Sequence, residues 1–260
     1  MQFTKHQLDA INHASGNLQL IACAGSGKTE VVARRVAALL NPKRGKLSPR
    51  NIVAFTFTDK AAAELKQRIV ERCQEELGDV AGLAEMYVGT IHGFCLELLK
   101  TEVPKFLKYE VLNDVQQILF IDRNSKKAGL TTSTDLKGQP LRRWVDTPRY
   151  AQALSIFREA TVDKKKLKKC SVREGFDAYR DLLEGKSQLD YSAILYEAVD
   201  VLSSDKDLRK RLAERVKQVI VDEYQDLNPV QEAVVHELHE LGAHVCVVGD
   251  DDQTIYQWRG

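Results

Sequence analysis

Short runs of apolar residues alternate, over residues 1–100, with longer segments in which apolar positions recur every three or four residues. The apolar runs are typical of buried strands, and the periodic segments are typical of amphipathic helices. The predicted strands are 18–22, 52–57 and 86–88. The predicted helices are 4–14, 29–40, 60–76 and 91–100, and Thr4 is a suitable N-cap for the first. This alternation predicts a parallel α/β sheet flanked by helices.

The pattern changes after residue 100. Residues 101–190 contain no run that indicates a buried strand, and several of their segments have helical periodicity. Strand patterns return at 218–221 and 245–248. We therefore predict a discontinuous α/β domain with an inserted helical subdomain. The predicted parts are 1–100 and 190–260 for the α/β domain and 101–189 for the insertion.

Composition indicates a globular protein, with 43% hydrophobic residues, 29% charged residues and a net charge of +1. The positive charge is local, because residues 101–190 hold 18 Lys and Arg against 13 Asp and Glu. The densest run is Lys164–Lys169, which could grip duplex DNA or could be the solvated face of a helix. A near-neutral chain is not by itself an indication of nucleic-acid binding.

Five cysteines at wide spacings, with no CxxC pair, suggest neither a disulfide framework nor a zinc site. The pattern favours a reducing compartment, and we expect a cytoplasmic protein. The polar N-terminus is unlike a signal peptide, and no apolar stretch is long enough to span a bilayer, so we expect no membrane partner.

A phosphate-binding motif, Ala22-Cys23-Ala24-Gly25-Ser26-Gly27-Lys28-Thr29, lies between the first predicted strand and the next helix. The two glycines allow the backbone to curl so that its N–H groups face an anion, and the helix N-terminus adds positive potential. We expect Lys28 to reach the β- and γ-phosphates of ATP and the Thr29 hydroxyl to hold Mg²⁺. The predicted nucleotide-binding residues of the loop are Ala24, Gly25, Ser26, Gly27, Lys28 and Thr29. A Gly-Ser turn beside a solvated lysine is the alternative, and the strand–loop–helix context argues against it.

A second half of the site follows the predicted strand at 218–221, where Asp222 and Glu223 come directly after apolar residues. Ligands of open α/β sheets bind at the carboxyl ends of strands. We expect Asp222 to bind Mg²⁺ and Glu223 to orient and deprotonate the attacking water. Two acids after a strand also suit a helix N-cap, and it is the pairing with Lys28 that makes the motif specific. Gln7 is a further candidate, since an amide can pair with N6 and N7 of adenine, although such a glutamine is more often a surface residue.

Further segments resemble, in order and approximate spacing, the motifs of superfamily 1A DNA helicases, the UvrD/Rep/PcrA group. The matching segments are 56–65 (motif Ia), 89–95 (motif Ib), 222–226 (motif II) and 248–260 (motif III). Gln7 falls where the Q motif lies, and Asp190-Tyr191 where the family has an Asp-Phe-Asp-like stretch. The resemblance implies a RecA-like P-loop NTPase domain, and it covers the inserted subdomain by position alone.

The resemblance also implies roles at matching positions. Gln253 would sense the γ-phosphate and would act as a catalytic residue together with Lys28, Asp222 and Glu223. Aromatic side chains would stack on bases of single-stranded DNA, an interaction that tolerates any sequence. The residues expected at that DNA interface are Phe57, Thr90, His92, Tyr256, Trp258 and Arg259. For Phe57 and Tyr256, ordinary core packing is an equal alternative.

The implied activity is that of an ATP- and Mg²⁺-dependent DNA helicase acting on single-stranded DNA and single-strand/duplex junctions. The family moves in the 3′ to 5′ direction and works in repair, replication or recombination. Alternatives are the motor of a helicase–nuclease of the AddA or RecB kind, an antiphage defence helicase, or a DNA-binding remnant without turnover. A nucleotide kinase or an ABC-type ATPase is disfavoured because neither an acceptor lid nor a Leu-Ser-Gly-Gly-Gln-like segment is found.

Three residues depart from the family pattern. Asp59 stands where an asparagine is usual, which puts a DNA phosphate contact in doubt because a carboxylate cannot donate a hydrogen bond. Glu30 stands where many relatives have an arginine that stacks on adenine, so another residue such as Arg34 would have to contact the base. Cys23 replaces a frequent glycine, and its oxidation could block the nucleotide.

The resemblance places motifs IV to VI, and a second RecA-like domain that carries arginine fingers, beyond Gly260. Arginine fingers accelerate phosphoryl transfer by about 10³ to 10⁵. We therefore expect the 260 residues alone to bind Mg·ATP weakly, to hydrolyse it very slowly and to unwind nothing.

Overall fold

A computed structural model describes residues 3–23, 25–44, 47–78, 80–135, 137–159 and 171–250 of the chain. Contacts between α-carbons divide the chain into two units, and each is described by itself. The first unit is made of Met1–Phe94, Val201–Leu227 and Gln231–Trp258, and the second is mainly Cys95–Asp200.

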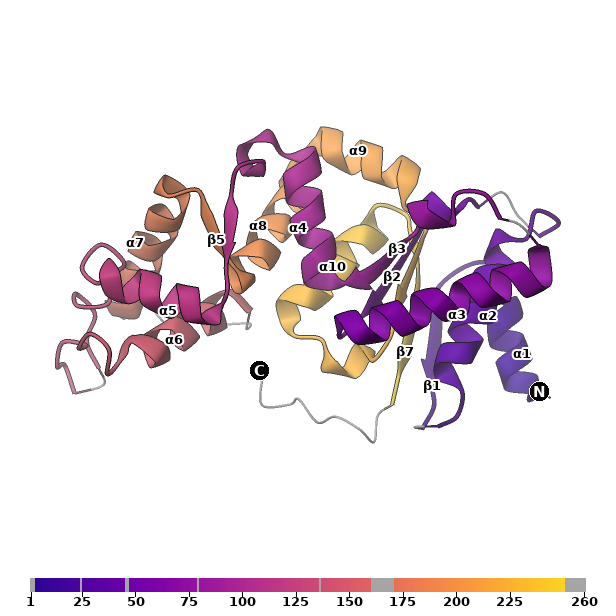
Figure 1. Cartoon of the computed structure of the whole chain (residues 1–260), viewed down its shortest axis with the longest axis horizontal. Helices are drawn as coiled ribbons and strands as arrows, with labels where there is room; N and C mark the ends of the chain where they lie inside the picture. The colour runs from indigo at the N-terminus through magenta and orange to yellow at the C-terminus, as the bar shows by residue number, and fades with distance from the viewer. Residues whose placement is uncertain are drawn as a thin grey trace. The chain divides into compact units, whose positions relative to one another are not determined.

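The first unit is built on a five-stranded parallel sheet (Figure 1). Its order is β1 (Leu18–Ile21), β7 (His244–Gly249), β6 (Gln218–Val221), β2 (Ile52–Thr56) and β3 (Tyr87–Thr90). All five strands predicted from apolar runs are therefore present, and the parallel α/β fold is confirmed. Because every strand runs in the same direction, all five carboxyl ends lie along one edge of the sheet.

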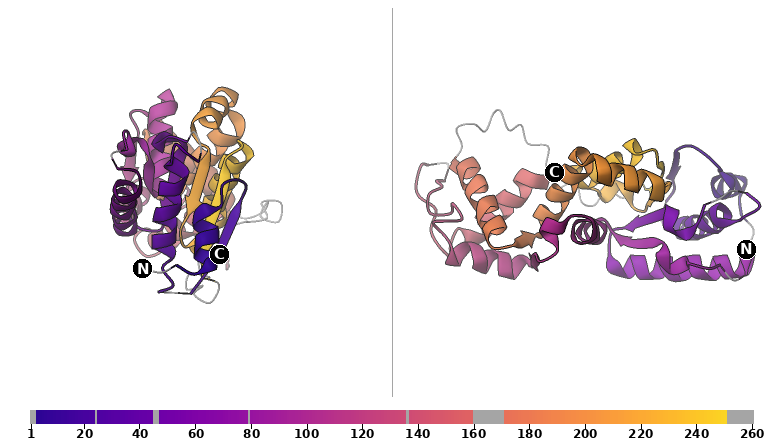
Figure 2. Two further views of the ribbon diagram at one scale, coloured as in Figure 1. Left: turned by 90° about the vertical axis from the view of Figure 1, so that its right-hand side faces the viewer. Right: turned by 90° about the horizontal axis from the view of Figure 1, so that it is seen from above.

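Helices cover both faces of this sheet. The helices of the first unit are α1 (Lys5–Asn12), α2 (Lys28–Leu40), α3 (Asp59–Leu77), α9 (Lys206–Arg215) and α10 (Pro229–Glu240), and α4 (Ile91–Glu102) begins in it. α2 connects β1 to β2 and α3 connects β2 to β3, and both connections move along the sheet toward β3. α10 connects β6 to β7 and moves in the opposite direction, toward β1. Right-handed crossovers therefore place α10 on the opposite face from α2 and α3. Figure 2 shows the sheet and its helices from two further directions.

The core between the sheet and the α2–α3 layer explains why these segments form amphipathic helices. Val32 and Val36 of α2 and Ile69 of α3 are completely buried against the sheet residues Ile52 and Ile220. Burial of each such side chain stabilises the fold by roughly 1.5–3 kcal/mol. This packing fixes the first turn of α2, and hence the preceding loop, relative to the strand ends.

The second unit contains the helices α5 (Asp114–Arg123), α6 (Thr147–Glu159), α7 (Ser171–Gly185) and most of α8 (Tyr191–Ser204). It also contains two parallel strands, β4 (Glu110–Leu112) and β5 (Gln188–Asp190). The expectation of no strand between 101 and 190 was wrong. Each strand has only 3 residues, so neither leaves an apolar run long enough to recognise in the sequence.

A buried polar cluster around Asp190 organises the second unit. The carboxylate is 1% exposed and accepts hydrogen bonds from Arg158 Nη1 at 2.8 Å, Tyr179 Oη at 2.8 Å and Gln117 Nε2 at 3.1 Å. Burial raises the pKa of Tyr179, whereas the Arg158 charge works to lower the pKa of Asp190. These contacts join α5, α6, α7 and β5, so Asp190 has a structural role in the unit.

Short 3₁₀ helices are η1 (Pro49–Asn51), η2 (Leu83–Glu85), η3 (Pro104–Phe106) and η4 (Tyr224–Asp226). In the described segments, no helix combines the length and the apolar character that crossing a bilayer requires.

Candidate functional site

The carboxyl edge of the five-stranded sheet gathers the candidate residues that the structure describes in the first unit. The phosphate loop follows β1, Phe57 follows β2, Thr90 ends β3, and Asp222 follows β6. Asp250, which sequence analysis did not single out as a site residue, follows β7. Segments far apart in the sequence thus meet at one edge, as expected for a ligand site of an open α/β sheet.

Lys28 lies at the centre of this edge. Its ammonium donates a hydrogen bond to the Ala22 carbonyl oxygen at 3.0 Å and lies 4.0 Å from Glu223 Oε2 and 3.9 Å from Asp250 Oδ2. The side chain is only 10% exposed. The structure therefore brings Lys28 and Glu223 together as the two motifs predicted.

Asp222 is largely withdrawn from water beside this lysine. Burial, and after it the negative charge of Glu223, raise the pKa of the Asp222 carboxyl to about 6, while the Lys28 charge acts in the opposite direction. The Glu223 amide donates to Asp222 Oδ1 at 3.2 Å. A partly buried carboxylate with a raised pKa is poised to bind a cation, because a cation relieves the cost of its charge.

Glu223 has a strained backbone and a fixed side chain. Its φ of 52° lies in the left-handed region, which non-glycine residues seldom adopt outside turns and functional sites. Gln225 Nε2 donates to Glu223 Oε2 at 2.7 Å, and the Asp250 amide donates to Gln225 Oε1 at 3.2 Å. The Gln225 amide thereby links the carboxylate after β6 to the end of β7.

Sequence reasoning missed the role of Gln225, although the residue stands inside the quoted motif 222–226. A Cβ added to Gly249 would lie 2.6 Å from Gln225 Oε1, so only glycine leaves room for this amide. The signal was a carboxamide two residues after the acid together with a glycine at the end of the next strand.

Gln7 is engaged within the protein on both sides of its amide. Its Oε1 accepts from the Thr4 amide at 2.8 Å, completing a capping box for α1, and its Nε2 donates to the Ser26 carbonyl oxygen at 3.0 Å. The predicted N-cap Thr4 is thus confirmed. Pairing of Gln7 with adenine remains a prediction. It would require the Gln7 amide to give up its bonds to Thr4 and Ser26 and to form bonds to the base instead.

The phosphate loop has the backbone that an anion cradle needs. Gly25 and Gly27 have φ of 75° and 85°, left-handed values that glycine adopts without strain, and Gly27 directly precedes α2. Thr29 is the second residue of α2 and is half-buried. Beside the loop, a hollow of about 560 Å³ opens between α1 and β1, with Gln7, Ser26 and Lys28 among its lining residues.

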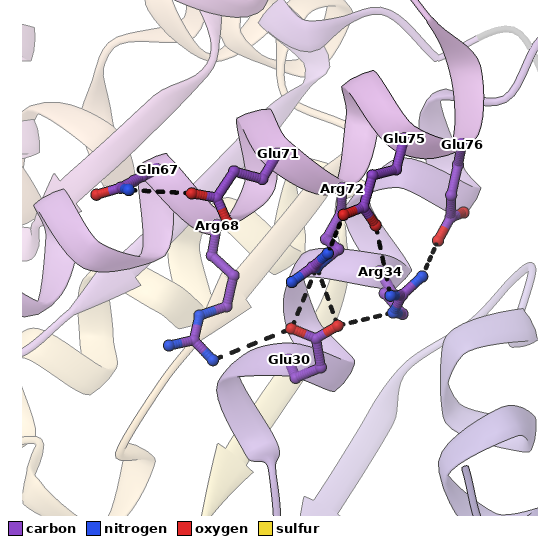
Figure 3. Close-up of polar contacts among 8 residues, drawn as sticks. All are labelled: Glu30, Arg34, Gln67, Arg68, Glu71, Arg72, Glu75 and Glu76. Atoms are coloured by element: carbon purple, nitrogen blue, oxygen red, sulfur yellow. Dashed lines mark hydrogen bonds and ion pairs between the residues drawn. The ribbon is translucent and has the colours of Figure 1, made fainter. Parts of the chain in front are cut away.

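A charge network ties the first turn of α2 to α3 (Figure 3). The Glu30 carboxylate, 9% exposed, lies 2.7 Å from Arg34 Nε, 3.0 Å from Arg72 Nε and 4.0 Å from Arg68 Nη1. Glu75 and Glu76 complete the network through Arg34 and Arg72. Glu30 therefore faces α3 rather than a base, and Arg34, the suggested substitute for a base contact, is already held by three carboxylates.

The DNA-contact candidates of the described segments lie after β2 and β3. Phe57 and His92 are half-buried, and the Thr90 hydroxyl accepts from the Gly93 amide at 3.1 Å. The register pairs Thr56 with Thr90, which places Phe57 next to the start of α4. Asp59 is the first residue of α3, where the helix dipole stabilises a carboxylate.

Several candidates fall outside the described residues. They are Ala24 of the loop, the Lys164–Lys169 run, and Gln253, Tyr256, Trp258 and Arg259 of the last segment.

Thr29 and Asp222 are the residues that fit a magnesium ion, one offering a hydroxyl and the other a carboxylate. In the parts of the chain that the structure describes, no three His, Cys, Asp or Glu side chains gather as a metal site. An ion held by Thr29 and Asp222 would complete its shell with phosphate oxygens and water, as Mg²⁺ usually does.

Comparison with known proteins identifies a family match over nearly the whole chain. Residues 3–260 match the UvrD/REP helicase N-terminal domain. The ATP-dependent DNA helicase Rep of Buchnera aphidicola subsp. Baizongia pistaciae (strain Bp) is 29% identical over 267 residues, covering 100% of the chain and 37% of the relative. PcrA, also called an ATP-dependent DNA helicase, is 29% identical in Bacillus subtilis (strain 168), with 98% of the chain and 33% of the relative covered. The chain thus spans about a third of the length of the relatives it matches.

Proposed function

Because its match extends over residues 3–260, the chain belongs to the UvrD/REP helicase N-terminal domain family, and we propose that it is the ATP-binding part of a DNA helicase motor. The observation that carries this proposal is the position of Lys28, whose ammonium lies about 4 Å from the carboxylates of both Glu223 and Asp250. A triphosphate entering the loop would replace these carboxylates as the partner of the ammonium.

Each residue of the edge then has a chemical task. The loop amides and Lys28 would bind the phosphates, and Thr29 and Asp222 would hold Mg²⁺, which would supply charge neutralisation at the phosphates. Glu223 accepts a proton from the attacking water, and Gln225 holds the Glu223 carboxylate in position. The adenosine extends toward the hollow beside Gln7.

The DNA would pass over the ends of β2 and β3. Phe57 offers a ring for base stacking, and Thr90 and His92 offer polar groups near the phosphates. The α2–α3 network links this side of the sheet to the phosphate loop, because α3 begins two residues after Phe57. In a protein of the relatives' length, a second RecA-like domain would close over the nucleotide, and movement along single-stranded DNA from 3′ to 5′ would follow. For the 260 residues alone we expect binding with very slow turnover.

The test is the affinity for Mg·ATP, measured by calorimetry on the parent chain and on Lys28→Ala. Lys43→Ala is the matched control, because Lys43 is an exposed lysine just past the opposite end of α2. We expect Lys28→Ala to lose at least tenfold in affinity and Lys43→Ala to bind like the parent. Equal affinities for all three proteins would overturn the proposal.

A further inference from the structure

An exposed tryptophan lies in the second unit, in the turn that precedes α6. Trp144 is 62% exposed, and the next residue, Val145, is 60% exposed. A large apolar surface left in water costs free energy, so an exposed indole beside an exposed valine requires an explanation.

The backbone of Trp144 is strained. Its φ is 63°, and the Val145 amide donates to the Arg143 carbonyl oxygen at 2.7 Å, which makes Trp144 the central residue of a γ-turn of the rare kind. A bulky side chain at positive φ is an outlier, and such strain persists only where the surroundings enforce it.

A fully buried carboxylate enforces this turn. Asp122, at the end of α5, accepts from the Trp144 amide at 2.8 Å and from Arg143 Nη2 at 2.7 Å. The buried Thr147 hydroxyl also accepts from the Trp144 amide, at 3.0 Å, and donates to Asp122 at 3.3 Å. The buried groups therefore hold the backbone of the turn while the indole stays outside.

The sequence around the turn is basic, and its cations are exposed. Residues 123–149 contain seven Lys and Arg and two Asp, a surplus of five that equals the surplus of the whole stretch 101–190. All seven cations are exposed: Arg123, Lys126, Lys127, Lys137, Arg142, Arg143 and Arg149. An exposed indole on a held backbone, with exposed arginines as its sequence neighbours, matches a ligand that has both flat rings and phosphates.

We propose that Trp144 stacks on an unpaired base of single-stranded DNA while Arg142 and Arg143 contact the adjoining phosphates. The ligand class rests on the proposed function, but this second contact belongs to the second unit, whereas the contacts proposed above belong to the first. The surplus of positive charge favours a nucleic acid over an apolar protein partner. A pre-formed turn also lowers the entropic cost of binding, because the backbone that carries the ring is already ordered.

The chain offers a direct reporter, because it contains two tryptophans, Trp144 and Trp258. In a Trp258→Phe background, a short oligo-dT strand should quench the remaining indole fluorescence in a saturable manner that weakens with salt. With fluorescence anisotropy of a dye-labelled oligo-dT strand as the readout, we expect Trp144→Ala in that background to reduce the affinity by about 5- to 150-fold, and Trp144→Phe to keep most of it. Val115→Ala is the matched control, because Val115 is a 67% exposed apolar residue of α5. Unchanged oligo-dT affinity for Trp144→Ala would overturn the proposal.

Two further variants separate binding from folding and from the function of the first unit. Trp144→Gly should unfold at a higher urea concentration than Trp144→Ala, since glycine relieves the positive φ, and both should bind DNA weakly. A lower midpoint for the glycine variant would contradict the strained turn on which the proposal depends. Phe57→Ala tests the DNA contact proposed for the sheet edge. If Phe57→Ala lowers the oligo-dT affinity and Trp144→Ala does not, this inference alone is defeated. If Trp144→Ala lowers the oligo-dT affinity and Phe57→Ala does not, this inference is supported and the contact at the sheet edge is defeated.

Discussion

The ammonium of Lys28 lies 3.9 Å from the carboxylate of Asp250, a residue more than 200 positions later in the chain. Lys28 begins α2, which follows β1 through the phosphate loop, and Asp250 follows β7, which pairs with β1 in parallel register. Asp250 is 2% exposed, so the pair places a buried negative charge beside the cation of the phosphate loop. The described part of the edge thus sets Lys28 against the acids Asp222, Glu223 and Asp250. This surplus of acids favours a triphosphate that arrives with Mg²⁺, because the cation offsets the repulsion between the carboxylates and the phosphates.

Asp222→Asn should alter how stability depends on pH. The folded pKa of about 6 lies above the ordinary value, so the folded chain keeps a proton that the unfolded chain releases. The contribution of Asp222 to stability is therefore present below about pH 4 and is lost as the pH rises through about 6. We expect the parent to lose on the order of 2 kcal/mol more than Asp222→Asn between pH 4 and pH 7, measured by urea unfolding. Parallel pH profiles for the two proteins would contradict this, and Asp9→Asn, at an exposed position of α1, serves as the control.

Glu30→Gln should destabilise the first unit. The substitution leaves Arg34 and Arg72 without their shared buried partner, and charged hydrogen bonds of this kind contribute about 1.5–3 kcal/mol. We expect a loss of about 2 kcal/mol in the free energy of urea unfolding. Glu71→Gln, on the outside of α3 with a single contact to Gln67, should lose less than about 0.5 kcal/mol. Equal losses would show that the network of Figure 3 does not join the two helices.

Gly249→Ala should disturb the site without removing any of its charged groups. The added methyl group would meet Gln225 Oε1 at 2.6 Å and push the amide away from Glu223. We expect slower hydrolysis with little change in Mg·ATP affinity, and a similar result for Gln225→Ala. Single-turnover hydrolysis beside calorimetry measures both quantities. A single-turnover rate equal to that of the parent in both variants would show that Gln225 has no part in hydrolysis.

Arg158→Ala should unfold the second unit at much lower urea concentration. It would leave the Asp190 carboxylate buried without its cation, a change that typically costs about 3–5 kcal/mol. Arg180→Ala is a suitable control because its ion pairs with Asp177 and Asp181 are exposed. A loss below about 1 kcal/mol for Arg158→Ala would mean that the cluster does not organise the unit.

The local elements could be predicted from the sequence because their causes are local. Apolar runs gave the five strands, the Gly-Ser-Gly-Lys-Thr segment gave the loop before α2, and Thr4 gave a helix start. Their sequence order does not state the spatial order, in which β6 and β7 lie between β1 and β2.

What the sequence could not show depends on side chains meeting over long distances. Glu30 reads as a solvated acid at a helix start, and its burial depends on two arginines more than 35 positions away. Gln225 shows its role only once β7 is placed beside β6. Trp144 gives no local signal of a positive φ, because Asp122, from the preceding helix, imposes it.

The central claim is that Lys28 and Asp222 serve one magnesium–triphosphate complex. Its most direct test is the affinity for ATP with Mg²⁺ and with EDTA, measured on the parent, Lys28→Ala and Asp222→Asn. We predict that Mg²⁺ tightens ATP binding to the parent, that Asp222→Asn loses this gain while keeping its affinity for metal-free ATP, and that Lys28→Ala binds weakly under both conditions. A full gain from Mg²⁺ in Asp222→Asn, or parent-like binding by Lys28→Ala, would contradict the account.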